Sequence, residues 1–173
     1  AQLGADQPLS ALAAATGAVI RQYEGTKELH EVIKYQGTLL VVTRQNVLLA
    51  FHAATGKQLW SWVPGDEGPI VPLTLAADEG RVFIRTDESI RCLSIGDGKP
   101  VWRFVPEGAG KRTKLKWPRE KLLVKDGVVL ASYGGKDPAA LNKDKYEYLG
   151  SHPRVHDYDA KLAALSAADG TLL

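Results

Sequence analysis

Short apolar runs rich in Val, Leu and Ile follow one another along the chain, separated by clusters of Gly, Asp, Asn, Thr and Pro. The pattern is clear in GTLLVVTRQNVLLAF at 37–51 and GRVFIRTDESIRCL at 80–93, each with a polar break in its middle. Such runs around a turn predict antiparallel strand pairs. Because the apolar positions show almost no helical period, we expect an all-β fold.

A hairpin-like unit recurs four times, and a glycine marks each copy. The copies are LSALAAATGAVIRQY around Gly17, LLAFHAATGKQLWSW around Gly56, IRCLSIGDGKPVWRF around Gly98 and LAALSAADGTLL around Gly170. Successive glycines are 39, 42 and 72 residues apart, so the last interval is one period with additional chain. Since glycine adopts positive φ without a Cβ penalty and so closes a tight hairpin, all four are predicted to be structural.

Tryptophan follows the glycine by four residues in two copies, as Trp60 and Trp102. A large ring at a fixed place in each repeat can bury much surface against the neighbouring repeat, so both tryptophans are predicted to be structural. The first copy has Arg21 at this place, and the last copy stops at Leu173, one residue before it. Edge repeats often depart from the pattern in this way.

A period of about 40 residues with four antiparallel strands is typical of β-propeller blades. We expect one partial β-propeller over residues 1–173, made of about three to four four-stranded antiparallel blades. Its parts are a half blade at 8–23, a blade at 29–63, a blade at 70–104 and a blade at 119–173 with an insertion at 134–159. The two ends do not complete each other's blade, so we expect a fragment of a larger propeller with sheet edges open to self-association.

The run AFHAATGKQLW at 50–60 resembles the tryptophan-docking repeat of the quinoprotein-like (PQQ-repeat) β-propeller superfamily. That superfamily includes the pyrroloquinoline quinone dehydrogenases and the non-catalytic propellers of the bacterial outer-membrane assembly type. The resemblance implies a parent of mostly seven or eight blades, a periplasmic or secreted location, and protein or other propeller blades as partners. The aspartate usual in the repeat is replaced by Ala13, His52, Ser94 and Ser166, which indicates divergent blades.

Composition and charge narrow the choice of function. Of the 173 residues, 45% are apolar and 24% are charged, as in an ordinary globular protein. The net charge of +2 gives no reason to expect nucleic acid or a membrane surface as partner. No apolar run is long enough to span a bilayer, and no signal peptide is recognisable. The only cysteine, Cys92, lies in an apolar run and is predicted to be buried rather than reactive.

A quinone-dependent dehydrogenase is the sharpest enzymatic hypothesis, because the resemblance implies PQQ on the propeller axis with a calcium ion and a catalytic aspartate. The cysteine pair common in such enzymes is missing here, and no close set of Asp, Glu and Asn residues forms a recognisable calcium motif. We therefore assign no catalytic residue. The predicted function is a non-catalytic binding or scaffold segment. The alternative is part of a dehydrogenase whose active site is completed by blades outside this sequence.

One polar segment, SHPRVHDYD at 151–159, has the composition of a metal site. Its His152, His156 and Asp157 could ligate zinc or a similar ion through imidazole nitrogens and a carboxylate. The competing interpretation is a polar surface loop before a strand.

A second segment, GKRTKLKWPREK at 110–121, surrounds Trp117 with basic residues. Such a composition can bind phosphate and stack a base, although the balanced charge elsewhere favours a solvated loop over nucleic-acid binding. Function is expected in the loops at 105–118 and 134–159, because loops on a rigid scaffold commonly carry it. The contacts expected there are Trp117, Tyr146, Tyr148 and His156.

Overall fold

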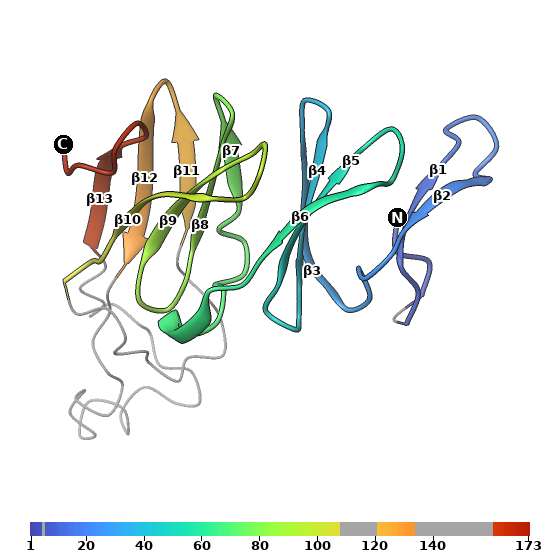
Figure 1. Ribbon diagram of the computed structural model, residues 1–173, viewed down its shortest axis with the longest axis horizontal. Helices are drawn as coiled ribbons and strands as arrows, with labels where there is room; N and C mark the ends of the chain where they lie inside the picture. The colour runs from blue at the N-terminus through green and yellow to red at the C-terminus, as the bar shows by residue number, and fades with distance from the viewer. Residues whose placement is uncertain (5, 108–120, 134–160) are drawn as a thin grey trace, which may run out of the picture.

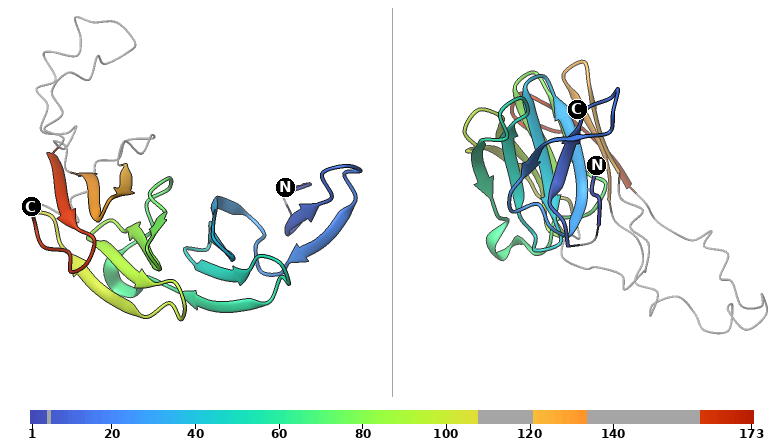
Figure 2. Two further views of the ribbon diagram at one scale, coloured as in Figure 1. Left: turned by 90° about the horizontal axis from the view of Figure 1, so that it is seen from above. Right: turned by 90° about the vertical axis from the view of Figure 1, so that its right-hand side faces the viewer.

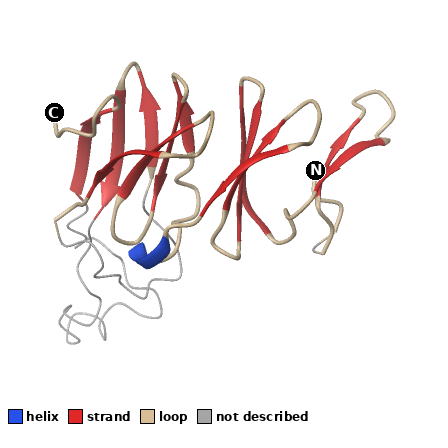
Figure 3. Ribbon diagram, in the orientation of Figure 1, coloured by secondary structure: helices blue, strands red, loops and turns tan. Residues whose placement is uncertain are grey.

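The computed structural model describes residues 1–4, 6–107, 121–133 and 161–173. Within these ranges the chain consists of strands joined by turns, together with a single short 3₁₀ turn, η1 (Gly65–Glu67) (Figures 1 and 3). The predicted all-β fold is therefore confirmed.

The described strands form four antiparallel sheets, in which each strand pairs with its neighbour in sequence. The first sheet contains β1 (Leu9–Leu12) and β2 (Val19–Tyr23), and the second contains β3 (Leu29–Tyr35), β4 (Thr38–Thr43), β5 (Leu48–His52) and β6 (Gln58–Trp62). The third sheet contains β7 (Ala76–Asp78), β8 (Arg81–Arg85), β9 (Ile90–Ser94) and β10 (Pro100–Phe104). The fourth sheet contains β11 (Leu122–Lys125), β12 (Val128–Tyr133) and β13 (Lys161–Ser166). Isolated bridges between Gln2 and Leu9 and between Leu165 and Leu172 extend the two outer sheets.

The four sheets stand one behind the other along an open arc, as the view from above shows (Figure 2). Two of them are complete four-stranded blades, and the first and fourth have fewer strands in the described residues. This arrangement confirms the predicted partial β-propeller of four-stranded antiparallel blades.

Apolar clusters fill the three spaces between successive sheets, because alternate residues of a strand point to opposite faces. In β4, Val41 packs toward the first sheet, whereas Leu40 and Val42 pack toward the third. In β8, Phe83 packs toward the fourth sheet and Val82 toward the second. All five side chains are fully buried, so these inner strands appear in the sequence as continuous apolar runs rather than alternating ones.

The connections between strands separate into two ends of the molecule (Figure 1). The hairpin end, at the top of Figure 1, holds the β1–β2, β5–β6 and β9–β10 hairpins. The connection end, at the bottom, holds η1 and the turns between β4 and β5 and between β8 and β9. Strands β10 and β12 also end, and strands β11 and β13 begin, at the connection end.

Candidate functional site

The side chains expected to bind a partner or a metal ion lie outside the described residues. They are Trp117, Tyr146, Tyr148, His152, His156 and Asp157. Those assignments therefore remain predictions. The described part of the connection end instead presents a cluster of polar side chains that sequence analysis did not identify.

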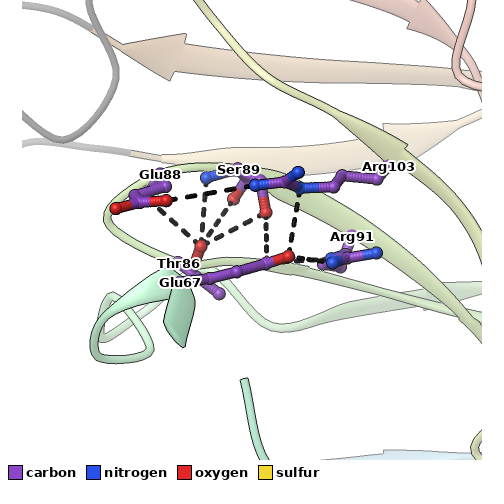
Figure 4. Close-up of polar contacts among 6 residues, drawn as sticks. All are labelled: Glu67, Thr86, Glu88, Ser89, Arg91 and Arg103. Carbon is purple, nitrogen blue, oxygen red and sulfur yellow. Dashed lines mark hydrogen bonds and ion pairs between the residues drawn. The ribbon is translucent and has the colours of Figure 1, made fainter. Parts of the chain in front are cut away.

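This Glu67 cluster consists of Glu67, Thr86, Glu88, Ser89, Arg91 and Arg103 (Figure 4). Glu67 ends η1, and only 8% of the residue is exposed. The turn depends on glycine at both ends, because Gly65 and Gly68 have φ of 61° and 73°. A Cβ on Gly68 would also lie 3.1 Å from the Cβ of Asp87. The sequence GDEG thus folds into a tight turn that places the Glu67 carboxylate against the third sheet.

Ser89 and Arg91 donate to the Glu67 carboxylate, and Arg103 forms an ion pair with it. Ser89 Oγ lies 2.6 Å and Arg91 Nε lies 2.9 Å from Oε2. Arg91 Nη2 also contacts Oε1, and Arg103 Nε lies 3.0 Å from the same oxygen. Hydrogen bonds to an ionised carboxylate are stronger than neutral ones. The cluster therefore holds the β6–β7 connection, which contains η1, against strands β9 and β10.

The turn between β8 and β9 is fixed by Thr86. Its Oγ1 accepts from the backbone N–H groups of Glu88 at 3.3 Å and Ser89 at 3.0 Å, as in a hydroxyl-capped turn. The Thr86 N–H in turn donates to the Ser89 carbonyl at 2.8 Å. These bonds hold the Ser89 hydroxyl where it reaches Glu67 and direct Glu88 toward Arg103, with 4.0 Å between the charged atoms.

The cluster combines a buried carboxylate with charged side chains that are partly exposed. Burial, and secondarily the charge of Arg103, lowers the pKa of Arg91. Arg103 and Glu88, by contrast, have side chains that are 39% and 46% exposed. The cluster can thus present a rigid pair of opposite charges to a partner.

The predicted structural tryptophans lie at the hairpin end and join neighbouring sheets. The Trp60 indole N–H donates to the carbonyl of Ile95 at 2.8 Å, and the Trp102 indole N–H donates to that of Ala167 at 3.0 Å. Each ring lies against the hairpin glycine of the following sheet, since a Cβ on Gly98 or on Gly170 would come within 2.7 Å of it.

Arg21 occupies the corresponding position between the first and second sheets. Its Nη1 donates to the carbonyl of Ala53 at 3.1 Å, and its Cδ lies 3.5 Å from the position of a Cβ on Gly56. The Tyr23 hydroxyl donates to the same carbonyl at 2.8 Å. A guanidinium group, planar and rich in donors, thus replaces the indole.

In the hairpin around Gly98, the side chain of Asp97 stabilises the turn. Asp97 stands directly before Gly98 and accepts the backbone N–H of Lys99 at 3.2 Å. Bonds from the Lys99 side chain and from Ser94 lower the pKa of Asp97 to about 2.

A second shielded carboxylate, Glu31 on β3, joins the second sheet to the segment before β7. The Leu75 N–H lies 3.3 and 3.4 Å from its two oxygens. Burial raises the pKa of Glu31, although backbone N–H groups around Leu75 and the charge of Lys121 oppose the rise.

Within 1–4, 6–107, 121–133 and 161–173, no three His, Cys, Asp or Glu side chains lie together as a metal site would require. No helix in this part of the chain could cross a membrane.

Comparison with known proteins gives one family and a set of similar folds. A family model described as outer membrane protein assembly factor BamB matches residues 5–173. No curated protein matches the chain significantly.

Three solved structures illustrate the similarity of fold. BamB from Moraxella catarrhalis is 20% identical with a TM-score of 0.63, over 100% of this chain and 49% of that one. The computationally designed Ika8 protein is 17% identical with a TM-score of 0.64, over 98% and 43%. Quinohemoprotein alcohol dehydrogenase ADHIIG from Pseudomonas putida HK5 is 14% identical with a TM-score of 0.63, over 98% and 31%. The chain thus spans less than half of each of these proteins.

Proposed function

The chain belongs to the family described as outer membrane protein assembly factor BamB, and we propose that it is a non-catalytic binding or scaffold segment of a β-propeller in that family. Its working location is the periplasm, and its partner is a protein of the outer-membrane assembly machinery. Both statements extend the family's description to this chain.

The observation that carries the proposal is the Glu67 cluster. Its buried carboxylate is held by Ser89, Arg91 and Arg103, so the cluster forms a firm support. Its outer members Arg103 and Glu88 are partly exposed. Val105, two residues after Arg103, is 52% exposed. Arginine beside exposed apolar surface is a frequent composition of protein interfaces.

A photo-crosslinking residue at Val105 tests the proposal in the protein as its source makes it. The control position is Lys99, whose side chain is 81% exposed near the other end of β10. We expect Val105, but not Lys99, to capture an outer-membrane assembly protein. Arg103→Ala should lower the yield at least about fivefold, since arginine anchors commonly contribute 1 kcal/mol or more. Equal capture from both positions would contradict the assignment of the connection end.

The dehydrogenase alternative predicts a different result. The purified protein would be supplied with PQQ and calcium, and reduction of an artificial electron acceptor would be followed in the presence of an alcohol. We expect no reduction above that of the protein without PQQ. Alcohol-dependent reduction would replace the scaffold proposal with the dehydrogenase alternative.

A further inference from the structure

Three Asp-Gly pairs occur in the chain, and each lies in a turn. They are Asp97–Gly98, Asp126–Gly127 and Asp169–Gly170. In such a pair the backbone nitrogen of glycine can attack the aspartate Cγ, because glycine has no side chain to obstruct the approach. The three pairs share this chemistry, so any difference in reactivity between them must come from the fold.

The reaction is an isomerisation that passes through a ring. A bond forms between the glycine nitrogen and Cγ as the bond from Cγ to its hydroxyl oxygen breaks, and the amide proton leaves with the hydroxyl as water. Water then opens either carbonyl of the resulting succinimide, which gives aspartate or isoaspartate. Ring closure requires a glycine N–H that can lose its proton and a carboxyl group that is protonated, because hydroxyl leaves more readily than oxide.

The Asp97–Gly98 pair is protected at both reacting groups. The Gly98 N–H donates to the Ser94 carbonyl at 2.9 Å. The Asp97 carboxylate accepts the Lys99 N–H at 3.2 Å, and its Oδ2 lies 3.0 Å from Lys99 Nζ. Since bonds from Lys99 and Ser94 lower the pKa of Asp97 to about 2, its carboxyl group is seldom protonated near neutral pH.

The Asp169–Gly170 pair is protected in the same way. The Gly170 N–H donates to the Ser166 carbonyl at 2.8 Å. Asp169 Oδ1 accepts the Thr171 N–H at 3.1 Å and the Thr171 hydroxyl at 2.8 Å. These bonds from Thr171 lower the pKa of Asp169, so this carboxyl group is also held in its ionised form.

The Asp126–Gly127 pair has neither protection. It forms the two-residue turn between Lys125 and Val128, where the β11–β12 hairpin reverses at the hairpin end (Figure 1). No group in the described residues accepts a hydrogen bond from the Gly127 N–H. The Asp126 side chain is 86% exposed, and its contact with Lys125 Nζ is 3.8 Å long, so the carboxylate is only weakly held.

We propose that Asp126 is a site of spontaneous isomerisation to isoaspartate in the folded protein, whereas Asp97 and Asp169 are protected from it. The hydrogen bonds of the glycine N–H and of the carboxylate distinguish three otherwise identical dipeptides. This inference does not depend on the proposed function.

The modification reaches the junction between the third and fourth sheets. The Gly127 carbonyl accepts the Ala167 N–H at 2.8 Å, and the Ala167 carbonyl accepts the Trp102 indole N–H at 3.0 Å. Isoaspartate adds one methylene group to the backbone directly before Gly127, which displaces the Gly127 carbonyl from Ala167. Isomerisation of Asp126 therefore loosens the segment that receives Trp102.

Peptide mapping of the aged protein tests the proposal. The folded chain would be kept at neutral pH for several weeks and digested with trypsin, which leaves the three Asp-Gly pairs in separate peptides. Isoaspartate is recognised as a second peptide of unchanged mass that resists a protease specific for aspartate. We expect it to form at Asp126 at least about tenfold faster than at Asp97 or Asp169, because their hydrogen bonds must break first.

Two controls separate the fold from the dipeptide. Asp126→Glu retains the charge but would have to form a less favourable six-membered ring, so the second form of this peptide should disappear. In urea, where the chain is unfolded, all three pairs should react at similar rates because the hydrogen bonds that distinguish them are lost.

The purified isoaspartate form tests the effect on the sheets. Loss of the bond between Ala167 and Gly127 should lower its Tm by about 2–4 °C, whereas Asp126→Glu kept for the same time should retain its Tm. An unchanged Tm of the isoaspartate form would refute the loosening at Trp102. Equal rates at the three pairs in the folded chain would overturn the proposal. The same holds for an Asp126 that stays unchanged while the unfolded chain reacts.

Discussion

Alanine at Gly170 and at Gly127 should separate the docking contact of Trp102 from backbone strain. The two glycines have φ of 75° and 76°, so alanine meets the same conformational penalty at both positions, about 1–2 kcal/mol. Their surroundings differ. A Cβ on Gly127 meets nothing within 4 Å, whereas one on Gly170 comes within 2.7 Å of Trp102.

The expected difference follows from the packing of the Trp102 ring. The residue is 8% exposed, and its ring centroid lies 5.8 Å from that of Phe83, so the ring has little space in which to move. Overpacking of this kind costs about 1–3 kcal/mol. Gly170→Ala should therefore lower the free energy of unfolding by about 2–5 kcal/mol, and Gly127→Ala by only the strain.

Urea unfolding followed by circular dichroism measures both variants. Trp102→Ala alone should cost about 3–5 kcal/mol, as expected for a large buried ring. When Trp102→Ala is present, Gly170→Ala should cost no more than Gly127→Ala, because the ring is gone. The double-mutant cycle should then show a coupling of about 1–3 kcal/mol between Gly170 and Trp102. Equal losses from Gly170→Ala and Gly127→Ala in the parent chain would refute the docking contact.

Three further predictions concern buried polar groups. Burial raises the pKa of Glu31 above its ordinary 4.5, so the folded chain should lose stability as the pH rises from 4.5 through the raised value. In urea titrations, Glu31→Gln should remove this loss, and the variant should be more stable than the parent chain at pH 7. Burial also raises the pKa of Cys92 to about 12, so a thiol reagent at pH 8 should label it only at the rate of global unfolding, and labelling at the rate of a free thiol would contradict this. Glu67→Gln should cost about 1–3 kcal/mol in urea unfolding through weaker bonds to Arg91 and Arg103, whereas the exposed neighbour Asp66→Asn should change stability by less than about 0.5 kcal/mol.

The repeat made the sheets predictable because the same local pattern serves every blade. The apolar runs at 37–51 and 80–93 predicted strand pairs, and the structure places their residues in the three clusters between the sheets. Trp60 and Trp102 were recognised by position alone, since a fixed offset from a glycine survives sequence divergence. The acceptors of their indole N–H groups are backbone carbonyls, and these have no signature in the sequence.

The Glu67 cluster had no comparable signal. Glu67 lies in a short acidic turn, and its partner Ser89 is 22 residues farther along the chain. Its partners Arg91 and Arg103 lie in strands β9 and β10. Arginine is common on the solvent-facing side of a strand, so the sequence does not mark either residue as a partner of Glu67. Arg21 illustrates the same limit, because in the sequence it looks like a lost tryptophan, although the structure shows that it takes over the contact. Long-range polar contacts of this kind follow from the register of strands, which a single sequence does not state.

The separation of the two ends of the molecule has a consequence for how such proteins diversify. The contacts that bind one sheet to the next through Trp60 and Trp102 lie at the hairpin end, away from η1 and the turn at Thr86. A graft or a natural insertion at that turn would therefore leave the tryptophan contacts in place. Positions of the connection end outside the Glu67 cluster can therefore vary at little risk to folding, so new binding specificities can arise there while the scaffold is retained.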